Sequence, residues 1–148
     1  MNNDILLVED NPDDAKLTLR GFRSNKVTNP IFAVRDGIEA LDFLHARGDY
    51  LERQDKPMPA LIVLDLHLPR LDGLGVLKAI RAEQPTRLIP VVILTSSEQD
   101  EDVISGYSLG ANSYVRKPVD FAEFLGAVKT LGVYWLLLNQ PLPERASR

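Results

Sequence analysis

Acidic, hydroxyl and amino side chains directly follow short apolar runs of this sequence, where they could carry out metal-assisted phosphoryl chemistry. The first run ends in Glu9 and Asp10, and later runs end in Asp65, Thr95 and Lys117. If these runs are parallel strands of one sheet, their carboxyl ends lie at the edge where such sheets bind ligands. The five side chains would then share one small site.

The expected charges of this site favour a divalent cation. Glu9, Asp10 and Asp65 together carry three negative charges, and Lys117 returns only one positive charge. Oxygen ligands without His or Cys favour Mg²⁺, which takes one or two carboxylates and keeps several waters. Beside that cation, Asp65 is a candidate nucleophile that would form an aspartyl phosphate. Mg²⁺ and Lys117 would then neutralise charge on the transferring oxygens.

Short apolar runs alternate five times with helical patterns. We expect strands within 4–10, 30–37, 60–65, 89–97 and 112–118, and helices within 11–26, 38–48, 74–85, 98–110 and 120–138. The runs at 61–64 and 91–94 are apolar without alternation, which is typical of parallel strands buried on both faces. This order predicts an α/β fold with a doubly wound, five-stranded parallel sheet.

Composition excludes several other functions. The chain has 148 residues, which fits one domain, and its net charge of −4 argues against a general nucleic-acid binder. It has no cysteine and only two histidines, so thiolate catalysis and a histidine-built metal site are excluded. The N-terminus lacks the basic region of a signal peptide, and no apolar stretch approaches the roughly 20 residues of a membrane span. We therefore expect a cytoplasmic protein without membrane insertion.

Four motifs in order carry a resemblance to a known family. The segments "LLVEDNPDD", "LIVLDLHLPRLDG", "VVILTSS" and "SYVRKP" resemble the receiver domain of two-component response regulators, the family that includes the chemotaxis protein CheY. The likeness runs from residue 4 to about 138, so we expect a receiver domain at 1–138 and a C-terminal tail at 139–148. It implies a flavodoxin-like (βα)5 fold. It also implies a phosphoacceptor rather than an enzyme, apart from slow self-dephosphorylation.

The resemblance implies a metal site beside the acceptor. Asp65 would be the phosphoacceptor, and Glu9 and Asp10 would form the acidic pocket. Asp10, Asp65 and the backbone carbonyl of His67 would coordinate the Mg²⁺ ion. Two other readings remain open. A phosphatase of haloacid-dehalogenase type also uses a strand-end Asp with Mg²⁺, but it needs a second acid at the position of His67. A receiver-like scaffold that is not phosphorylated would lack the acceptor or the lysine.

The resemblance also implies the switching residues. Thr95 would bond the phosphoryl oxygen and Lys117 would pair with it. Tyr114 would be the aromatic switch residue that enters the space freed by Thr95. A cis peptide is expected between Lys117 and Pro118. Elsewhere, Asn11 is expected to cap the first helix, where Asp13 and Asp14 would be ordinary first-turn acids, and Ser97 is expected to cap the fourth helix.

The last helix is expected to have two apolar sides. Its core stripe would comprise Phe121, Phe124, Leu125, Val128, Leu131 and Trp135. Val133, Tyr134 and Leu137 lie opposite this stripe, which predicts a homodimer built on this helix. The rival is that the Pro-rich tail folds back over these residues. Too few residues follow Pro118 for a DNA-binding domain, so we expect output through contact with another protein. The tail and the polar insertion before "ALIVLD" resemble regulators paired with phytochrome-type histidine kinases, which makes such a sensor kinase the expected partner.

Overall fold

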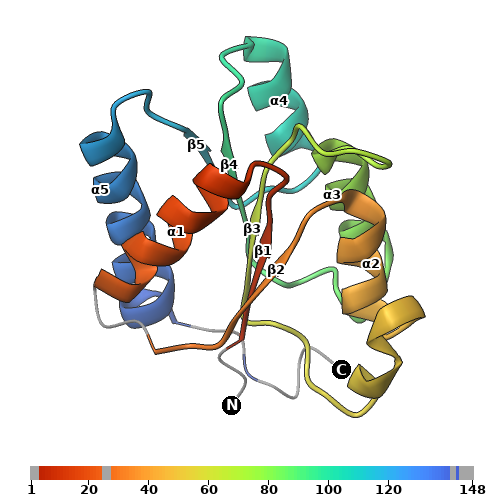
Figure 1. The fold of residues 1–148 in the computed structure, drawn as a ribbon. Coiled ribbons are helices and arrows are strands. Elements are labelled where there is room, and N and C mark those ends of the chain that lie inside the picture. Colours follow the sequence, from red (N-terminus) through yellow and green to blue (C-terminus); the bar gives the residue numbers. More distant parts are fainter. Residues whose placement is uncertain (1–3, 25–27, 141–142, 144–148) are drawn as a thin grey trace.

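The chain folds into a five-stranded parallel sheet with helices on both faces, in a computed structural model that describes residues 4–24, 28–140 and 143 (Figure 1). The strands and helices alternate as β1 Ile5–Val8, α1 Pro12–Ser24, β2 Ile31–Val34, α2 Gly37–His45, β3 Leu61–Leu64, α3 Gly73–Ala82, β4 Val91–Thr95, α4 Asp100–Ser108, β5 Ser113–Arg116 and α5 Phe121–Gly132. The strand order is β2-β1-β3-β4-β5, and every pairing is parallel. The expected doubly wound, flavodoxin-like fold is confirmed.

The strand order creates a crevice beside β1. From β1 the chain moves outward to β2 on one side, and it then returns to build β3, β4 and β5 on the other side. Helices α1 and α5 therefore lie on one face of the sheet, and α2 and α3 lie on the opposite face (Figure 1). The loops after β1 and β3 diverge toward opposite faces, which is the position where open parallel sheets bind ligands.

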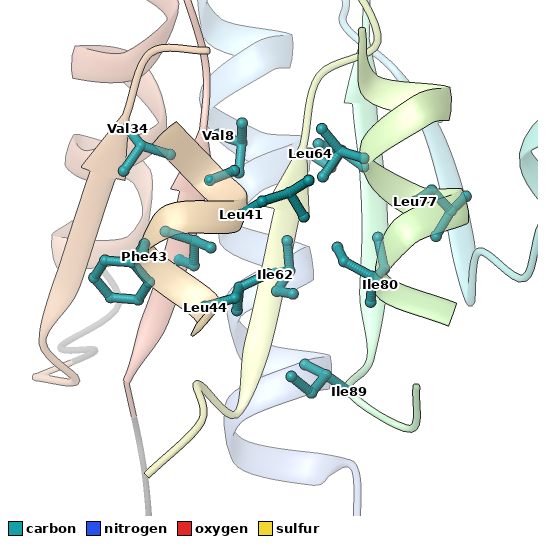
Figure 2. Packing of buried hydrophobic residues seen from close by; sticks show 14 of the residues in the cluster. Val8, Val34, Leu41, Phe43, Leu44, Ile62, Leu64, Leu77, Ile80 and Ile89 are labelled. Atoms are coloured by element: carbon teal, nitrogen blue, oxygen red, sulfur yellow. The ribbon is translucent and has the colours of Figure 1, made fainter. Parts of the chain in front are cut away.

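Each central strand is apolar on both sides because it contributes to two cores. Leu6 of β1 and Ile62 of β3 pack against α2 and α3, in the cluster shown in part in Figure 2. Leu7 and Val63, one residue further on in each strand, pack against α1 and α5. The edge strand β2 is different, since Phe32 is 39% exposed. The expected burial of the third and fourth strands is confirmed.

Most helices begin at a polar side chain that accepts backbone N–H groups. Asp36, Asp72 and Asp120 cap α2, α3 and α5 in this way. Asn11 caps α1 as expected, because its Oδ1 accepts the N–H groups of Asp13 and Asp14. The expected cap of α4 is wrong. Gln99 stands at its N-cap without a side-chain hydrogen bond. The Ser97 hydroxyl donates to Asp102 in the first turn and accepts the N–H of Gln99 at 3.4 Å, before the helix begins.

Arg81, near the end of α3, joins the loops around β4. Its guanidinium donates to the carbonyl oxygens of Arg87, Ile89 and Gly110 at 3.0, 2.8 and 2.9 Å. It also donates to Asn112 Oδ1 at 3.0 Å, an oxygen that accepts the N–H of Val91 as well. One side chain thus ties α3 to the segments that lead into β4 and β5.

The polar connection before β3 holds an unexpected 3-10 helix, η1 Gly48–Arg53. It packs on α2 because the Tyr50 hydroxyl donates to Glu39 Oε1 at 2.7 Å. The Arg53 guanidinium also lies over the Phe43 ring, 3.6 Å from its centroid. A cation over a ring face stabilises such a contact without an apolar pattern in the sequence.

The last helix departs from the expected pattern. After α5 the chain continues as a π-helical segment, η2 Val133–Leu138. Phe124, Val128 and Leu131 are buried, but Phe121 is 53% exposed and lies under the Arg20 guanidinium, so its place in the core stripe was wrong.

The opposite side of this helix is open, as expected. Tyr134 and Leu137 are 49% and 65% exposed, and Val133 is half-buried. Together α5 and η2 span 18 residues, Phe121–Leu138, with a mean hydropathy of 1.4. By length and composition this segment is sufficient to cross a bilayer, contrary to the expectation that no stretch approaches that length. Core helices of globular domains pass the same test, and this one packs against α1 and the sheet. The tail at 139–148 lies outside the described residues apart from 139, 140 and 143.

Candidate active site

Asp65 stands at the carboxyl end of β3, and its backbone and side chain are both held. Its N–H donates to the Val8 carbonyl at 3.0 Å, which extends the pairing of β3 with β1. The residue is only 6% exposed. Its Oδ1 accepts the Thr95 hydroxyl at 2.7 Å and the His67 N–H at 3.2 Å, and its Oδ2 accepts the Lys117 ammonium at 2.8 Å. The sheet thus presents a single oriented carboxylate at the crevice.

Gly73 packs closely against the backbone of Asp65, a role that sequence reasoning missed. A Cβ atom at position 73 would lie 2.2 Å from the carbonyl oxygen of Asp65 and 2.6 Å from the Cα of Leu66. The Gly73 N–H donates to the Leu66 carbonyl at 2.9 Å. The helix α3 can approach the acceptor loop this closely only because residue 73 has no side chain.

Lys117 reaches the site from the end of β5. Its backbone N–H donates to the Thr95 carbonyl at 2.7 Å, and its side chain is 5% exposed. Its Nζ lies 2.5 Å from Glu9 Oε1, 2.9 Å from Asp14 Oδ2 and 2.8 Å from Asp65 Oδ2. An ammonium group has three N–H donors, so these three carboxylates use all of them.

The predicted convergence of Asp65, Thr95, Lys117 and Glu9 is therefore seen, and Asp14 joins them unexpectedly. Asp14 shares a helix face with Thr18, one turn later, and Thr18 is fully buried. That spacing is the signal by which Asp14 could have been found, since residues four apart lie on one side of a helix. Asp13, by contrast, is exposed as expected.

The pKa values of the two buried acids, Glu9 and Asp65, shift in opposite directions. Burial raises the pKa of Glu9 to about 7, and the neighbouring Asp65 carboxyl adds to that rise. Burial also acts to raise the pKa of Asp65. Hydrogen bonding with Glu9, Lys117 and Thr95 outweighs it and holds the Asp65 pKa below its ordinary value. Burial would lower the pKa of Lys117, but its carboxylate partners raise it instead. Asp65 is therefore the acid of this pair that is ionised at neutral pH.

The oxygen atoms at this edge suit a hard cation, but they are not arranged as a ready metal cage. Within the described ranges, no three His, Cys, Asp or Glu side chains are grouped so that they could hold a metal ion. Asp10 is exposed, while the ammonium of Lys117 lies between Glu9 and Asp65. Mg²⁺ needs only one or two carboxylates with water, so the donor set fits it chemically. The predicted ligands Glu9, Asp10, Asp65 and the His67 carbonyl stay a prediction.

Thr95 and Tyr114 lie between the acceptor and α4. Thr95 is fully buried, and its hydroxyl is bound to Asp65. Tyr114 packs against the core on the side of α4, where a Cβ atom on Gly106 would lie 3.2 Å from its ring. Its hydroxyl is buried and has no hydrogen-bond partner among the residues that the structure describes. The predicted switch pair is thus close to the surface formed by α4 and β5.

The expected cis peptide between Lys117 and Pro118 is wrong, because this bond is trans in the structure. The trans form is favoured by about 0.5 to 1 kcal/mol before proline. With it, Lys117 already makes its backbone bond to Thr95 and reaches all three carboxylates.

Comparisons with known proteins agree with this geometry. The family model of the response regulator receiver domain matches residues 5–129. The response regulator Rcp1 of Synechocystis sp. is 36% identical over 132 residues, which cover 89% of this chain and 88% of Rcp1. Its Mn²⁺-bound crystal structure has a TM-score of 0.88 at 34% identity and covers 95% of this chain and 99% of its own.

Two further solved structures are similar. The phosphorylated cyanobacterial phytochrome response regulator RcpA has a TM-score of 0.88 at 33% identity, covering 95% of this chain and 99% of its own. The bacteriophytochrome response regulator RtBRR has a TM-score of 0.76 at 46% identity, covering 100% of this chain and 90% of its own.

Proposed function

Because the chain belongs to the response regulator receiver domain family, and within it to the phytochrome-associated regulators, we propose that a sensor histidine kinase phosphorylates it on Asp65. The single observation that carries the proposal is the Asp65 carboxylate itself. It is buried, ionised, and bound by one hydroxyl and one ammonium at the carboxyl ends of the strands. RcpA is a phytochrome response regulator solved in a phosphorylated form, which supports both the reaction and a phytochrome-type kinase as donor.

In the proposed reaction a carboxylate oxygen of Asp65 attacks the phosphorus atom of a phosphohistidine. The new O–P bond forms as the N–P bond breaks, and the imidazole keeps the electron pair and takes a proton from solvent. Lys117 lies 2.8 Å from Asp65 Oδ2, where it would pair with a phosphoryl oxygen. The Thr95 hydroxyl lies at the other carboxylate oxygen and would bond a second one. The protein would accept the group and lose it only by slow self-dephosphorylation, and we propose that it does so in the cytoplasm.

A divalent cation, Mg²⁺ in our proposal, would be held by Asp10, Asp65 and the His67 carbonyl, with Glu9 beside them. When bound, it would neutralise charge on the transferring oxygens. The crystal structure of Rcp1 with Mn²⁺ supports a divalent cation in a close relative. For Glu9 and Asp65 the cation would compete with Lys117, which now bonds both acids.

Phosphorylation would reach the surface through Thr95 and Tyr114. If the Thr95 hydroxyl leaves Asp65 to bind the phosphoryl group, the space beside it becomes available to the Tyr114 ring. The buried Tyr114 hydroxyl makes no hydrogen bond among the described residues that would hold the ring in place. The output would be altered contact with a protein partner at α4 and β5.

Mass spectrometry after incubation with acetyl phosphate and Mg²⁺ tests the acceptor. We expect the wild-type chain to gain one phosphoryl group and Asp65→Asn to gain none, because the amide keeps the shape but is not a nucleophile. Asp55→Asn, the same change at an exposed site, should gain it at the wild-type rate. Phosphorylation of Asp65→Asn at that rate would place the acceptor elsewhere. Repeated turnover of a phosphomonoester would instead favour the phosphatase reading.

We also propose that two copies associate through the end of the last helix. Tyr134 and Leu137 are exposed, and Val133 is half-buried next to them. At roughly 25 cal/mol per Å² of apolar area, these side chains could contribute several kcal/mol before association costs. Two-fold symmetry is the usual arrangement for a self-complementary surface.

Sedimentation of a double variant, Tyr134→Glu with Leu137→Glu, tests this dimer. We expect the variant to sediment as a monomer and still to be phosphorylated. Leu51→Glu with Leu88→Glu adds the same charge at exposed apolar positions outside the last helix and should leave the dimer intact. A wild-type chain that is monomeric at tens of micromolar, phosphorylated or not, would refute the dimer.

A further inference from the structure

Asp14 contacts the active-site residue Lys117 from a helix, not from the end of a strand. Glu9 and Asp65 follow β1 and β3, whereas Asp14 belongs to the first turn of α1. Its Oδ2 lies 2.9 Å from Lys117 Nζ. Its side chain is 26% exposed, against 2% for Glu9 and 7% for Asp65. Asp14 is therefore the most exposed of the three acids that bind Lys117.

The backbone that presents Asp14 is fixed. Asn11 Oδ1 accepts its N–H at 3.1 Å, and the buried Thr18 hydroxyl donates to its carbonyl at 2.8 Å. The N–H of Asn11 in turn donates to Glu9 Oε2 at 3.2 Å. A carboxylate on so short a side chain, at a fixed helical position, has little freedom to follow Lys117 if the ammonium moves.

All three donors of Lys117 are in use before any phosphoryl group arrives. To bind a phosphoryl oxygen on Asp65, the ammonium must give up or share one of these hydrogen bonds. Of the two bonds that Lys117 does not make to the acceptor, the one to Asp14 has the more exposed partner. Asp14 also adds a negative charge close to Asp65, which opposes the approach of an anionic phosphoryl donor.

We propose that Asp14 is a positioning residue that holds Lys117 on the α1 side of the site and thereby slows phosphoryl transfer to Asp65. The inference rests on the proposed function. In the transfer, an oxygen of Asp65 attacks the phosphorus of the donor. The bond from phosphorus to the leaving acetate or imidazole breaks, and the leaving group keeps the electron pair. Lys117 must turn toward the phosphoryl oxygens as their charge develops, and this motion breaks or lengthens its bond to Asp14.

Rates of phosphorylation by acetyl phosphate test the proposal, at a Mg²⁺ concentration that saturates each variant. Asp14→Asn removes the charge with little change in shape, and we expect a rate roughly threefold to fivefold above that of the control. The control is Asp13→Asn, which removes the same charge one residue away, where the side chain is exposed. Asp14→Glu restores the charge and should return the rate toward the wild type.

Nuclear magnetic resonance of the Lys117 amino group gives a second readout, in the unphosphorylated chain. We expect its Nζ protons to exchange slowly with water in the wild type and in Asp13→Asn, and faster in Asp14→Asn. An Asp14→Asn rate equal to or below that of Asp13→Asn would overturn the inference while leaving the acceptor in place. Unchanged exchange of the amino protons would overturn it as well. A wild-type chain that gains no phosphoryl group would overturn the proposed function, and this inference with it.

Discussion

Replacing Glu9 with glutamine should stabilise the metal-free protein at neutral and higher pH. Burial raises the pKa of this carboxyl from 4.5 to about 7, so the folded state favours its protonated form. Between these two pH values the folded chain binds more protons at Glu9 than the unfolded chain does. The contribution of Glu9 to stability is therefore fully present below about pH 4.5 and is lost as the pH rises through 7.

The size of the effect follows from the shift. Each pKa unit corresponds to about 1.4 kcal/mol, so the rise would be worth about 3 kcal/mol if Glu9 titrated alone. Asp65 interacts with Glu9, and its pKa moves in the opposite direction, which reduces the net effect. We therefore expect Glu9→Gln to raise the free energy of unfolding by about 1 to 2 kcal/mol at pH 8. At pH 4.5 the difference should nearly vanish, since Glu9 is then protonated.

Urea denaturation with EDTA present, at pH values from 4.5 to 8.5, measures this difference. Glu98→Gln, the same change at an exposed site, should leave the stability unchanged at every pH. Added Mg²⁺ should stabilise the wild type more than Glu9→Gln, because the variant lacks one acidic oxygen donor. A variant that is less stable than the wild type at pH 8, or equally shifted at both ends of the range, would refute this account of the acid cluster.

Three other substitutions test single contacts. Thr95→Val keeps the shape of a fully buried side chain but removes its bond to Asp65, so we expect a loss of about 1 kcal/mol in urea denaturation. In nuclear magnetic resonance spectra, phosphorylation of Thr95→Val should leave the Tyr114 ring resonances where they lie in the unphosphorylated wild type. If these resonances shift on phosphorylation as they do in the wild type, the proposed switch is contradicted. Arg81→Met removes four hydrogen bonds and should lower the free energy of unfolding by about 3 to 5 kcal/mol, and Arg81→Lys should restore little of it. A loss under about 1 kcal/mol would show that water replaces these hydrogen bonds. Gly73→Ala places a Cβ against the Asp65 carbonyl, so the thermal midpoint and the phosphorylation rate should both fall, and an unchanged rate would argue against close support of the acceptor.

The alternation of strands and helices and the positions of Asp65, Thr95 and Lys117 could be predicted because each depends on a local pattern. A run of apolar residues marks a strand buried on both faces, and a polar residue directly after it must lie at the sheet edge. The spacing of Asp14 from the buried Thr18 indicates an inward-facing side chain, but the contact of Asp14 with Lys117 has no local signal. It depends on where the first turn of α1 lies relative to β5, which only the tertiary structure defines.

The misplaced elements have equally specific causes. Phe121 follows the helical spacing of the core stripe, but it lies in the first turn of α5, where the helix has not yet reached the sheet core, and Arg20 covers its ring. The helix η1 has a polar sequence and is held by Tyr50 and Arg53, whose contacts are with side chains of α2. Patterns of hydrophobicity report burial by apolar contact and miss segments held by polar or cation–ring contacts.

The two apolar clusters on either side of the sheet have a consequence for redesign and for sequence drift. Leu6 and Leu7 are covalent neighbours, but they belong to different clusters, whereas Leu6 and Ile62 are far apart in sequence and share one. Substitutions should therefore compensate one another between residues of the same cluster on paired strands, and combine more nearly additively between residues of different clusters. A combinatorial library for this chain is best divided into two halves by cluster. The half beneath α1 and α5 can then be repacked while the half beneath α2 and α3 is left untouched.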